Sequence, residues 1–242
     1  MKTVSPALQF NGLSKRYGKT PAVSSLSLEV DAGTTFGLIG ANGAGKTTLI
    51  KCLLDFCGFQ AGSINIFGIP SHRTEARSRL AFLPERFIPP YYLSGKDFLQ
   101  FMSQMYGRRG ELEDNIATLS ALDLSPDILA RPVRLLSKGM TQKLGLAGCL
   151  LSARELLVMD EPASGLDPKA RALFKAALKA VQAAGRTVFL TSHSLVDVDE
   201  MCDQIGVMHQ GALRYCGSPA QLKQHYEATT LEQAFLRSIG EN

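Results

Sequence analysis

The sequence has 242 residues, of which 45% are apolar and 20% charged, so it can bury a sizeable core as one large domain or as a core with a subdomain. The formal net charge is +4, with Lys and Arg scattered rather than grouped in blocks, which does not demand a nucleic-acid partner. The five cysteines are dispersed and form no CxxC pair and no Cys/His metal spacing, which argues against a zinc motif and predicts reduced thiols in a cytosolic protein.

The first part of the chain has the pattern of short strands. It begins with "MKTVSPALQF", which lacks the apolar stretch of a signal peptide, and no later apolar run approaches the roughly 20 residues that a membrane helix needs. The runs "ALQF", "SLSLEV", "TTFGLIG" and "SINIFG" alternate or are apolar throughout, and turn-rich pieces separate them, which predicts strands. One helix is expected from Lys46 to about Leu54. For any work at a membrane, we expect another protein to anchor this chain.

The pattern then becomes helical, and after that strands and helices alternate. Residues 86–144 have helical spacing and are predicted to form an insertion. Two apolar runs follow, "ELLVMDEP" and "TVFLTSH", and the helix between them has Asp167 as its N-cap, Pro168 in its first position and Gly185 just past its end. This alternation predicts βαβ units and a parallel sheet. The tail from about Tyr226 is predicted to be helical and amphipathic and to serve as a docking element.

A glycine-rich loop follows the strand predicted at "TTFGLI". The stretch "GANGAGKTT" fits G-x-x-x-x-G-K-[ST], and a helical run follows it, which is the context that distinguishes a phosphate-binding loop from a chance glycine-rich turn. Glycines let backbone N–H groups turn towards phosphates, and the helix N-terminus adds a positive dipole end. Lys46 is expected to reach the β- and γ-phosphates, and the Thr47 hydroxyl is expected to reach Mg²⁺. The residues predicted to contact the nucleotide here are Gly40, Asn42, Gly43, Ala44, Gly45, Lys46, Thr47 and Thr48.

Two adjacent acids stand at the end of the strand predicted at "LLVM". Open α/β sheets bind ligands at the carboxyl ends of their strands, so Asp160 and Glu161 are placed to act on a nucleotide. Asp160 can hold Mg²⁺ directly or through water, and Glu161 can polarise the attacking water. The alternative is a helix cap or a solvated pair. Because two acids beside a triphosphate are costly without a metal, the sequence implies Mg²⁺ as well as ATP.

These motifs together resemble the ATP-binding subunits of ABC transporters. The phosphate loop, "LLSKGM", "LLVMDEPASGLD" and "TSH" occur in the order found in that family, and the resemblance covers about residues 7–220. It implies one α/β domain over residues 1–242: a RecA-like P-loop NTPase core with an antiparallel β subdomain (about 1–85 and 145–225) and an inserted helical subdomain (86–144). Residues 226–242 would form a C-terminal helical tail. Tyr17 in "KRYG" stands where the family stacks an aromatic ring on adenine.

The resemblance also implies that each nucleotide lies between two subunits arranged head to tail. The signature segment "LSKGM" of one subunit would bind the γ-phosphate held by the other, through Ser137 and the Gly139 amide. From the residues alone, the favoured interpretation of Ser137 is an ordinary N-cap for a helix over about residues 138–152. Asp167 ends the stretch "SGLD" that matches the family's inter-subunit loop, and it must also cap its own helix.

Three further positions carry predictions. His193 in "TSH" matches the family's switch histidine, which contacts the γ-phosphate, and "SLVD" from Ser194 is predicted to form a capping box behind it. The signature commonly has glycine and glutamine where this chain has Lys138 and Met140, a variant that resembles exporters of the type-2 ABC class. Glu85 stands where the family usually has glutamine, and we expect it to keep a metal-binding and coupling role with altered metal dependence.

The function implied is an ATPase that powers a membrane transporter, an exporter on the evidence of the signature variant. Its expected partners are a second copy of itself and an integral membrane permease, and no nucleic acid is expected. The expected location is the cytoplasmic face of a bacterial-type membrane. The stretch "RFIPPYYLSGKDFLQFM" either lines the groove for a helix of the membrane subunit or forms ordinary core. The alternative function is a soluble ABC ATPase acting on nucleic acid or in cofactor assembly. The sequence does not identify a cargo.

Overall fold

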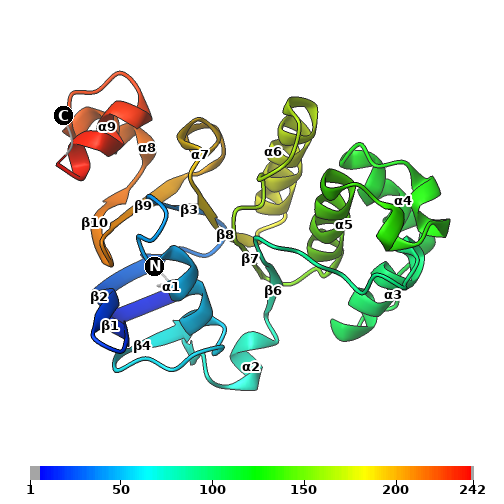
Figure 1. Cartoon of the computed structure of the whole chain (residues 1–242), viewed down its shortest axis with the longest axis horizontal. Coiled ribbons are helices and arrows are strands. Elements are labelled where there is room, and N and C mark those ends of the chain that lie inside the picture. Colours follow the sequence, from blue (N-terminus) through cyan, green and yellow to red (C-terminus); the bar gives the residue numbers. More distant parts are fainter. Residues whose placement is uncertain (1–5, 241–242) are drawn as a thin grey trace.

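A six-stranded sheet forms the centre of the computed structural model, which describes residues 6–240 (Figure 1). The strand order is β10-β9-β3-β8-β7-β6, and all neighbours run parallel except β10, which pairs antiparallel with β9. The strands are β3 (Thr35–Ile39), β6 (Leu80–Leu83), β7 (Leu156–Met159), β8 (Thr187–Ser192), β9 (Gln204–His209) and β10 (Ala212–Gly217). Strands β3, β7 and β8 are buried along their whole length, as expected for parallel strands covered on both faces. The predicted parallel sheet is confirmed.

A second, antiparallel sheet packs against this core. Its order is β2-β1-β4-β5, and its strands are β1 (Leu8–Tyr17), β2 (Thr20–Val30), β4 (Ala61–Ile66) and β5 (Ile69–Pro70). Aromatic side chains join the two sheets, since the ring of Phe189 on β8 stacks on Phe36 at 5.7 Å and meets Phe10 of β1 at 6.4 Å between centroids. Helix α1 (Lys46–Leu53) contributes to the same buried cluster. The sheet is the predicted antiparallel β subdomain.

Helices dominate the part of the chain between β6 and β7. The short helix α2 (Thr74–Arg77) precedes β6, and after β6 come α3 (Gly95–Met105), α4 (Leu112–Ala121), two 3₁₀ turns, η1 (Pro126–Ala130) and η2 (Val133–Leu135), and α5 (Lys138–Leu151). Figure 1 shows α3, α4 and α5 grouped to one side of the central sheet. Helix α5 crosses the predicted boundary at residue 144 and leads directly into β7. The exact division into subdomains stays a prediction.

Helix α6 (Pro168–Ala183) begins and ends where its capping residues predict. The Asp167 Oδ1 accepts a hydrogen bond from the Ala170 amide at 2.8 Å, and Gly185 just beyond the helix has a φ of +75°, a conformation that glycine adopts without strain. The capping box predicted at Ser194 is wrong. Ser194 precedes α7 (Leu195–Met201), but its side chain accepts no capping hydrogen bond from that helix.

Two short helices close the chain, α8 (Pro219–His225) and α9 (Leu231–Ser238). Leu231 and Ala234 of α9 are buried, as expected for one face of an amphipathic helix, and the role of the tail as a docking element stays a prediction. Among the helices of residues 6–240, none is long and apolar enough to cross a membrane. Residues 241–242 of the predicted tail lie outside the described residues. So do residues 1–5, on which part of the signal-peptide prediction rests.

Candidate active site at the ends of the parallel strands

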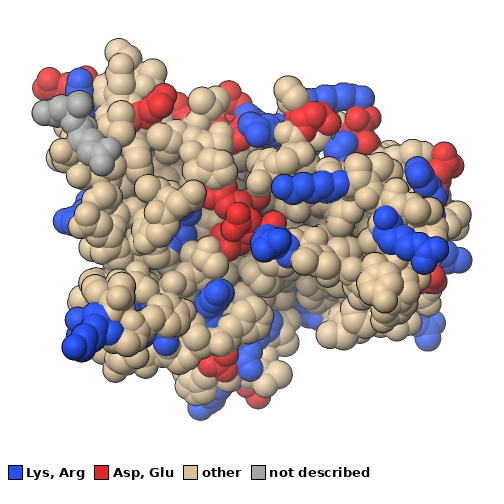
Figure 2. Space-filling view, in the orientation of Figure 1, with Lys and Arg blue, Asp and Glu red and all other residues tan. Residues whose placement is uncertain are grey.

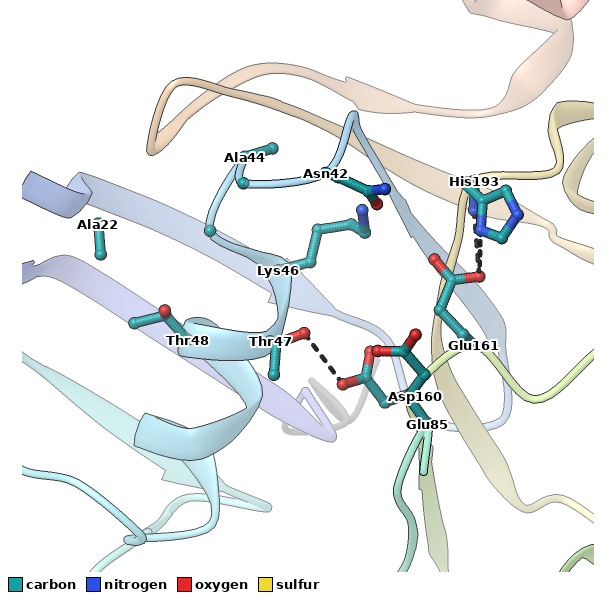
Figure 3. A pocket seen from close by; sticks show the side chains of 12 residues that line it. Ala22, Asn42, Ala44, Lys46, Thr47, Thr48, Glu85, Asp160, Glu161 and His193 are labelled. Carbon is teal, nitrogen blue, oxygen red and sulfur yellow. Dashed lines mark hydrogen bonds and ion pairs between the residues drawn. The ribbon is translucent and has the colours of Figure 1, made fainter. Parts of the chain in front are cut away.

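A cavity of about 370 Å³ opens where the central parallel strands end (Figure 3). Because the carboxyl ends of parallel strands meet at one edge of a sheet, residues from distant parts of the sequence converge there. The predicted catalytic residues Lys46, Glu161 and His193 all line it. The lining residues are Ala22, Asn42, Gly43, Ala44, Gly45, Lys46, Thr47, Thr48, Glu85, Asp160, Glu161 and His193.

The glycine-rich loop has a backbone that only glycine fits at its tightest point. Gly45 has a φ of +110°, and a Cβ atom there would lie 2.3 Å from the Ala22 carbonyl oxygen. The loop is anchored by hydrogen bonds from the Ala44 amide to Ala41 and from the Gly211 amide to Ala44. The loop therefore has a fixed shape, and the N-terminus of α1 opens directly into the cavity.

Lys46 carries its charge into this cavity from a buried position. Its Nζ donates to the Gly40 carbonyl at 2.6 Å and to the Ala41 carbonyl at 3.3 Å, so the amine folds back over its own loop. Burial lowers the pKa of Lys46, while the carboxylates of Glu161, Asp160 and Glu85 act in the opposite direction. A buried ammonium held by neutral carbonyls is suited to receive an anionic ligand.

Asp160 is fixed by two hydroxyl groups. Thr47 donates to its Oδ2 at 3.1 Å, and Thr191 at the end of β8 donates to its Oδ1 at 2.5 Å. A threonine hydroxyl and a carboxylate that converge in this way are oxygen donors of the kind that Mg²⁺ prefers. Within residues 6–240, no group of three or more His, Cys, Asp or Glu gathers closely enough to hold a metal alone. The donor set thus fits an ion that completes its shell with water and phosphate oxygens, as Mg²⁺ commonly does.

Glu161 and His193 form the second polar pair of the cavity. His193 Nδ1 lies 2.8 Å from Glu161 Oε2, and the His193 amide donates to the same oxygen at 3.3 Å. Figure 3 shows the other carboxylate oxygen turned towards Lys46. Glu161 has a φ of +49°, a left-handed conformation that is strained for a non-glycine residue and that recurs at active sites. Its carboxylate is held in one orientation beside the cavity, where it can position a water molecule.

Charge on the surface agrees with this placement. Figure 2 shows acidic side chains gathered near the middle of the face, over the region of β7 and β8, with Lys and Arg distributed around them. The basic residues form no single block in that view, as the sequence predicts. This face therefore carries acidic side chains close to the strand ends, where a cation would favour the binding of a polyphosphate.

Five of the predicted nucleotide contacts are not among the residues that line the cavity. Gly40 is one of them, although its carbonyl accepts a hydrogen bond from Lys46 Nζ. Tyr17, at the end of β1, is half exposed, and its hydroxyl lies 3.8 Å from Cys57 Sγ. Ser137 Oγ accepts from the Met140 amide at 3.2 Å, so it is an N-cap, as one of its two interpretations predicts. Gly139 begins the same helix, and Asp167 caps α6. One chain therefore brings together the phosphate loop, the acids and the histidine, but not the signature segment.

A second cavity of about 490 Å³ borders the signature segment, lined by Glu85, Arg86, Phe87, Ile88, Leu136, Lys138, Thr141, Gln142 and Ser164. Glu85 lines both cavities, so it connects the phosphate site to the surface of the helical region.

Two further residues at the site carry no sequence prediction. Thr191 holds Asp160, and its Oγ1 also accepts from the Glu161 amide at 3.0 Å. The buried side chain of Gln142 on α5 donates to the Pro162 carbonyl at 3.2 Å, next to the acidic pair. A signal for Thr191 was present, because it is a polar residue at the end of an apolar strand beside His193. No local signal marks Gln142, whose partner lies on another element.

Comparison with known proteins gives consistent matches over nearly the whole chain. Residues 23–164 match the family described as "ABC transporter". The Nod factor export ATP-binding protein I of Ralstonia nicotianae is 35% identical over 91% of this chain and 70% of its own length. The linearmycin resistance ATP-binding protein LnrL of Bacillus subtilis is 30% identical over 97% of this chain and 76% of its own length.

A solved structure titled as the ATP-binding subunit of an ABC transporter superposes with a TM-score of 0.86. It is 26% identical and covers 96% of this chain and 99% of its own. Across the curated relatives compared, the chain spans from 58% to 76% of their length.

Proposed function

The chain belongs to the ABC transporter family as one of its ATP-binding, ATP-hydrolysing subunits, and from this premise we propose that ATP joins two copies of it to drive a membrane exporter. The observation that carries the proposal is the division of the motifs. Lys46, Glu161 and His193 line one cavity, whereas Ser137 and Gly139 lie outside it on α5 and its cap. A nucleotide site that a second copy completes would use both the residues that line the cavity and the signature segment.

Within one copy, each residue has a distinct task. Lys46 would exchange its carbonyl partners for the β- and γ-phosphate oxygens of ATP. Thr47 and Asp160 would hold Mg²⁺, which supplies neutralisation of the phosphate charge when bound. Glu161 would orient a water molecule for in-line attack on the γ-phosphate and accept its proton, while His193 holds the Glu161 carboxylate in place. The catalysis is mainly positioning and electrostatic stabilisation.

The second copy would contribute its signature segment. Ser137 and the Gly139 amide lie at the N-terminus of α5, where backbone N–H groups and the helix dipole favour an anion. Lys138 at the first position of this helix adds a positive charge. Together they suit the γ-phosphate of an ATP held by the other copy. Asp167 would contact the second copy while still capping α6.

The membrane partner would dock on the surface beside η2 and α3. Within the stretch "RFIPPYYLSGKDFLQFM", Phe98 and Leu99 are core residues, but Ile88, Tyr91 and Tyr92 are largely exposed. Exposed apolar and aromatic side chains gathered in one segment are typical of a protein interface. We propose that a helix of an integral membrane permease occupies this surface, at the cytoplasmic face of the membrane. The relatives named for Nod factor export favour an exporter.

Replacement of Glu161 by glutamine tests the proposal. Glu161→Gln keeps the shape of the side chain but cannot accept a proton, so it should bind ATP, lose hydrolysis by about a thousandfold and accumulate as an ATP-bound dimer. ATP binding, phosphate release and light scattering with and without ATP measure the three properties. A variant that turned over at the wild-type rate would remove Glu161 from the catalytic role. Stimulation of the wild-type ATPase by nucleic acid, without a membrane partner, would favour the soluble alternative.

A further inference from the structure

The loop of residues 164–167 and the turn that carries His193 are joined by one side chain. Arg171, in the first turns of α6, donates from Nε to the Leu166 carbonyl at 3.1 Å. Its Nη1 also lies 3.5 Å from the Asp197 Oδ2 on α7. The guanidinium therefore contacts the loop through one nitrogen and α7 through another, a geometry for which its rigid fork is suited and an ammonium is not.

Asp197 is a firm attachment point on α7. It lies in the first turn of that helix, and its side chain is only 5% exposed. Lys175 of α6 makes a second ion pair with it, from Nζ to Oδ1 at 3.1 Å. Burial alone would raise the pKa of Asp197, but a hydrogen bond with Ser194 and the charges of Lys175 and Arg171 outweigh it and hold the pKa below its usual value. Asp197 is thus a buried carboxylate anchored to α6.

His193 has few fixed contacts of its own, so its position follows the start of α7. Its side chain is 64% exposed, and its ring nitrogen and amide both contact the same oxygen of Glu161. The chain continues from His193 directly into Ser194, whose amide bonds to Ser192 Oγ at 3.0 Å, and then into α7. A shift of α7 relative to α6 would move the histidine and, through it, the Glu161 carboxylate.

We propose that Arg171 is a positioning residue that transmits the arrival of a second copy at the loop of residues 164–167 to His193 and Glu161. Contact at the loop would displace the Leu166 carbonyl, and the displacement would pass through Arg171 to Asp197. Because Asp197 lies in the first turn of α7, the start of that helix would move. This inference rests on the proposed function, in which that loop faces the second copy. It assigns to Arg171 an effect on hydrolysis without contact with ATP.

Arg171→Met tests the connection, with Lys175→Met as its matched control. Arg171→Met removes both contacts of the guanidinium but keeps a long apolar side chain, and since Arg171 is 42% exposed the fold should tolerate the change. We expect kcat to fall by at least about fivefold, while the affinity of the monomer for ATP stays unchanged. The dependence of the ATPase rate on protein concentration should also change, because the variant has lost the coupling between the contact with the second copy and the catalytic residues. Lys175→Met removes the shorter of the two ion pairs to Asp197 but leaves the Leu166 contact, so kcat should stay near wild type.

The outcomes separate a positioning role from a structural one. Thermal unfolding of both variants reports their stability, and a structural role predicts that Lys175→Met loses as much kcat as Arg171→Met or more. That result would overturn the inference about Arg171 and leave the two-copy site standing. So would a wild-type kcat in Arg171→Met, if Ser137→Ala is inactive in the same assay. Normal hydrolysis by Ser137→Ala would instead overturn the two-copy site. A second measurement combines Arg171→Met with Asp197→Asn, whose effects on kcat should not add if the two residues act as one link.

Discussion

Three carboxylates share the cavity with a single buried lysine. Asp160 and Glu161 have fixed partners among the hydroxyls and the histidine, and Glu85 enters from the end of β6. All three act to raise the pKa of Lys46, against the burial that lowers it. The Glu85 carboxylate therefore offsets part of the effect of burial on the pKa of Lys46, and the same carboxylate repels the phosphates that Lys46 is placed to bind.

Glu85→Gln should separate these two effects. Removing one carboxylate relieves repulsion of the γ-phosphate, so ATP should bind more tightly without Mg²⁺, and the Mg²⁺ concentration for half-maximal hydrolysis should change by about tenfold. Nucleotide titrations in the presence of a chelator and Mg²⁺ titrations of the ATPase measure the two quantities. If neither the Mg²⁺ dependence nor transport-coupled turnover changed, Glu85 would have no metal or coupling role.

At the scale of elements, the N-termini of α5 and α6 each have two roles. Each contains a capping residue, and each lies in a segment proposed to contact the second copy. Ser137 caps α5 and Asp167 caps α6 through side-chain hydrogen bonds to backbone amides of the first turn. The same residues lie in the two segments proposed to meet a second copy. A substitution at either position therefore changes helix stability and inter-subunit chemistry together, unless the replacement keeps the cap.

Asp167 allows the two jobs to be separated. Asp167→Ala removes the acceptor for the Ala170 amide and should lower the free energy of unfolding by about 1 kcal/mol, whereas Asp167→Asn keeps a good N-cap and should leave it nearly unchanged. Urea unfolding of the protein without nucleotide measures both. If Asp167 also contacts the second copy, Asp167→Asn should still lower the ATPase rate, because the charge is lost. If Asp167→Asn had the ATPase rate of the wild type, capping α6 would be the only role of Asp167.

At the scale of the whole molecule, the phosphate site and the signature segment lie in different parts of one chain. The first lies at the strand ends of the central sheet, and the second begins α5 in the helical part (Figure 1). A head-to-tail pair of copies would place each signature segment over the other copy's phosphates and close the assembly as a two-fold dimer. Each of the two nucleotide sites would then need the phosphate loop of one chain and the signature segment of the other.

Mixing two inactive variants tests this arrangement. Ser137→Ala should be inactive because its signature segment is impaired, and Lys46→Ala because its phosphate loop is. In a head-to-tail dimer of one of each, one site contains both defects and the other contains neither, so an equal mixture should regain up to about a quarter of the wild-type sites. A phosphate-release assay after mixing measures the recovery. No recovery would contradict the shared site, and two different Ser137 variants, which leave no intact site when mixed, provide the negative control.

Local sequence signals account for most of the fold. Strand alternation, the capping residues of α5 and α6, Gly185 beyond α6 and the tail helix follow from interactions within one or two turns of chain, and all are confirmed. The capping box at Ser194 fails although its pattern is correct. Asp197, its expected acidic member, also makes ion pairs with Lys175 and Arg171 of α6. These tertiary contacts are not part of the local pattern, and the backbone cap that the pattern predicts is missing.

By itself, the sequence determined which chemistry is available: a phosphate loop, an acidic pair, a histidine and a signature segment, each recognisable because its members are neighbours in the chain. Only the tertiary structure decided which of them meet. The register that pairs Met159 with Leu190 places Asp160 beside Thr191, and the packing of α6 on α7 brings Arg171 to Asp197. Such contacts depend on strand register and helix packing, which are set by the burial of the whole core and leave no mark on the short stretches they connect.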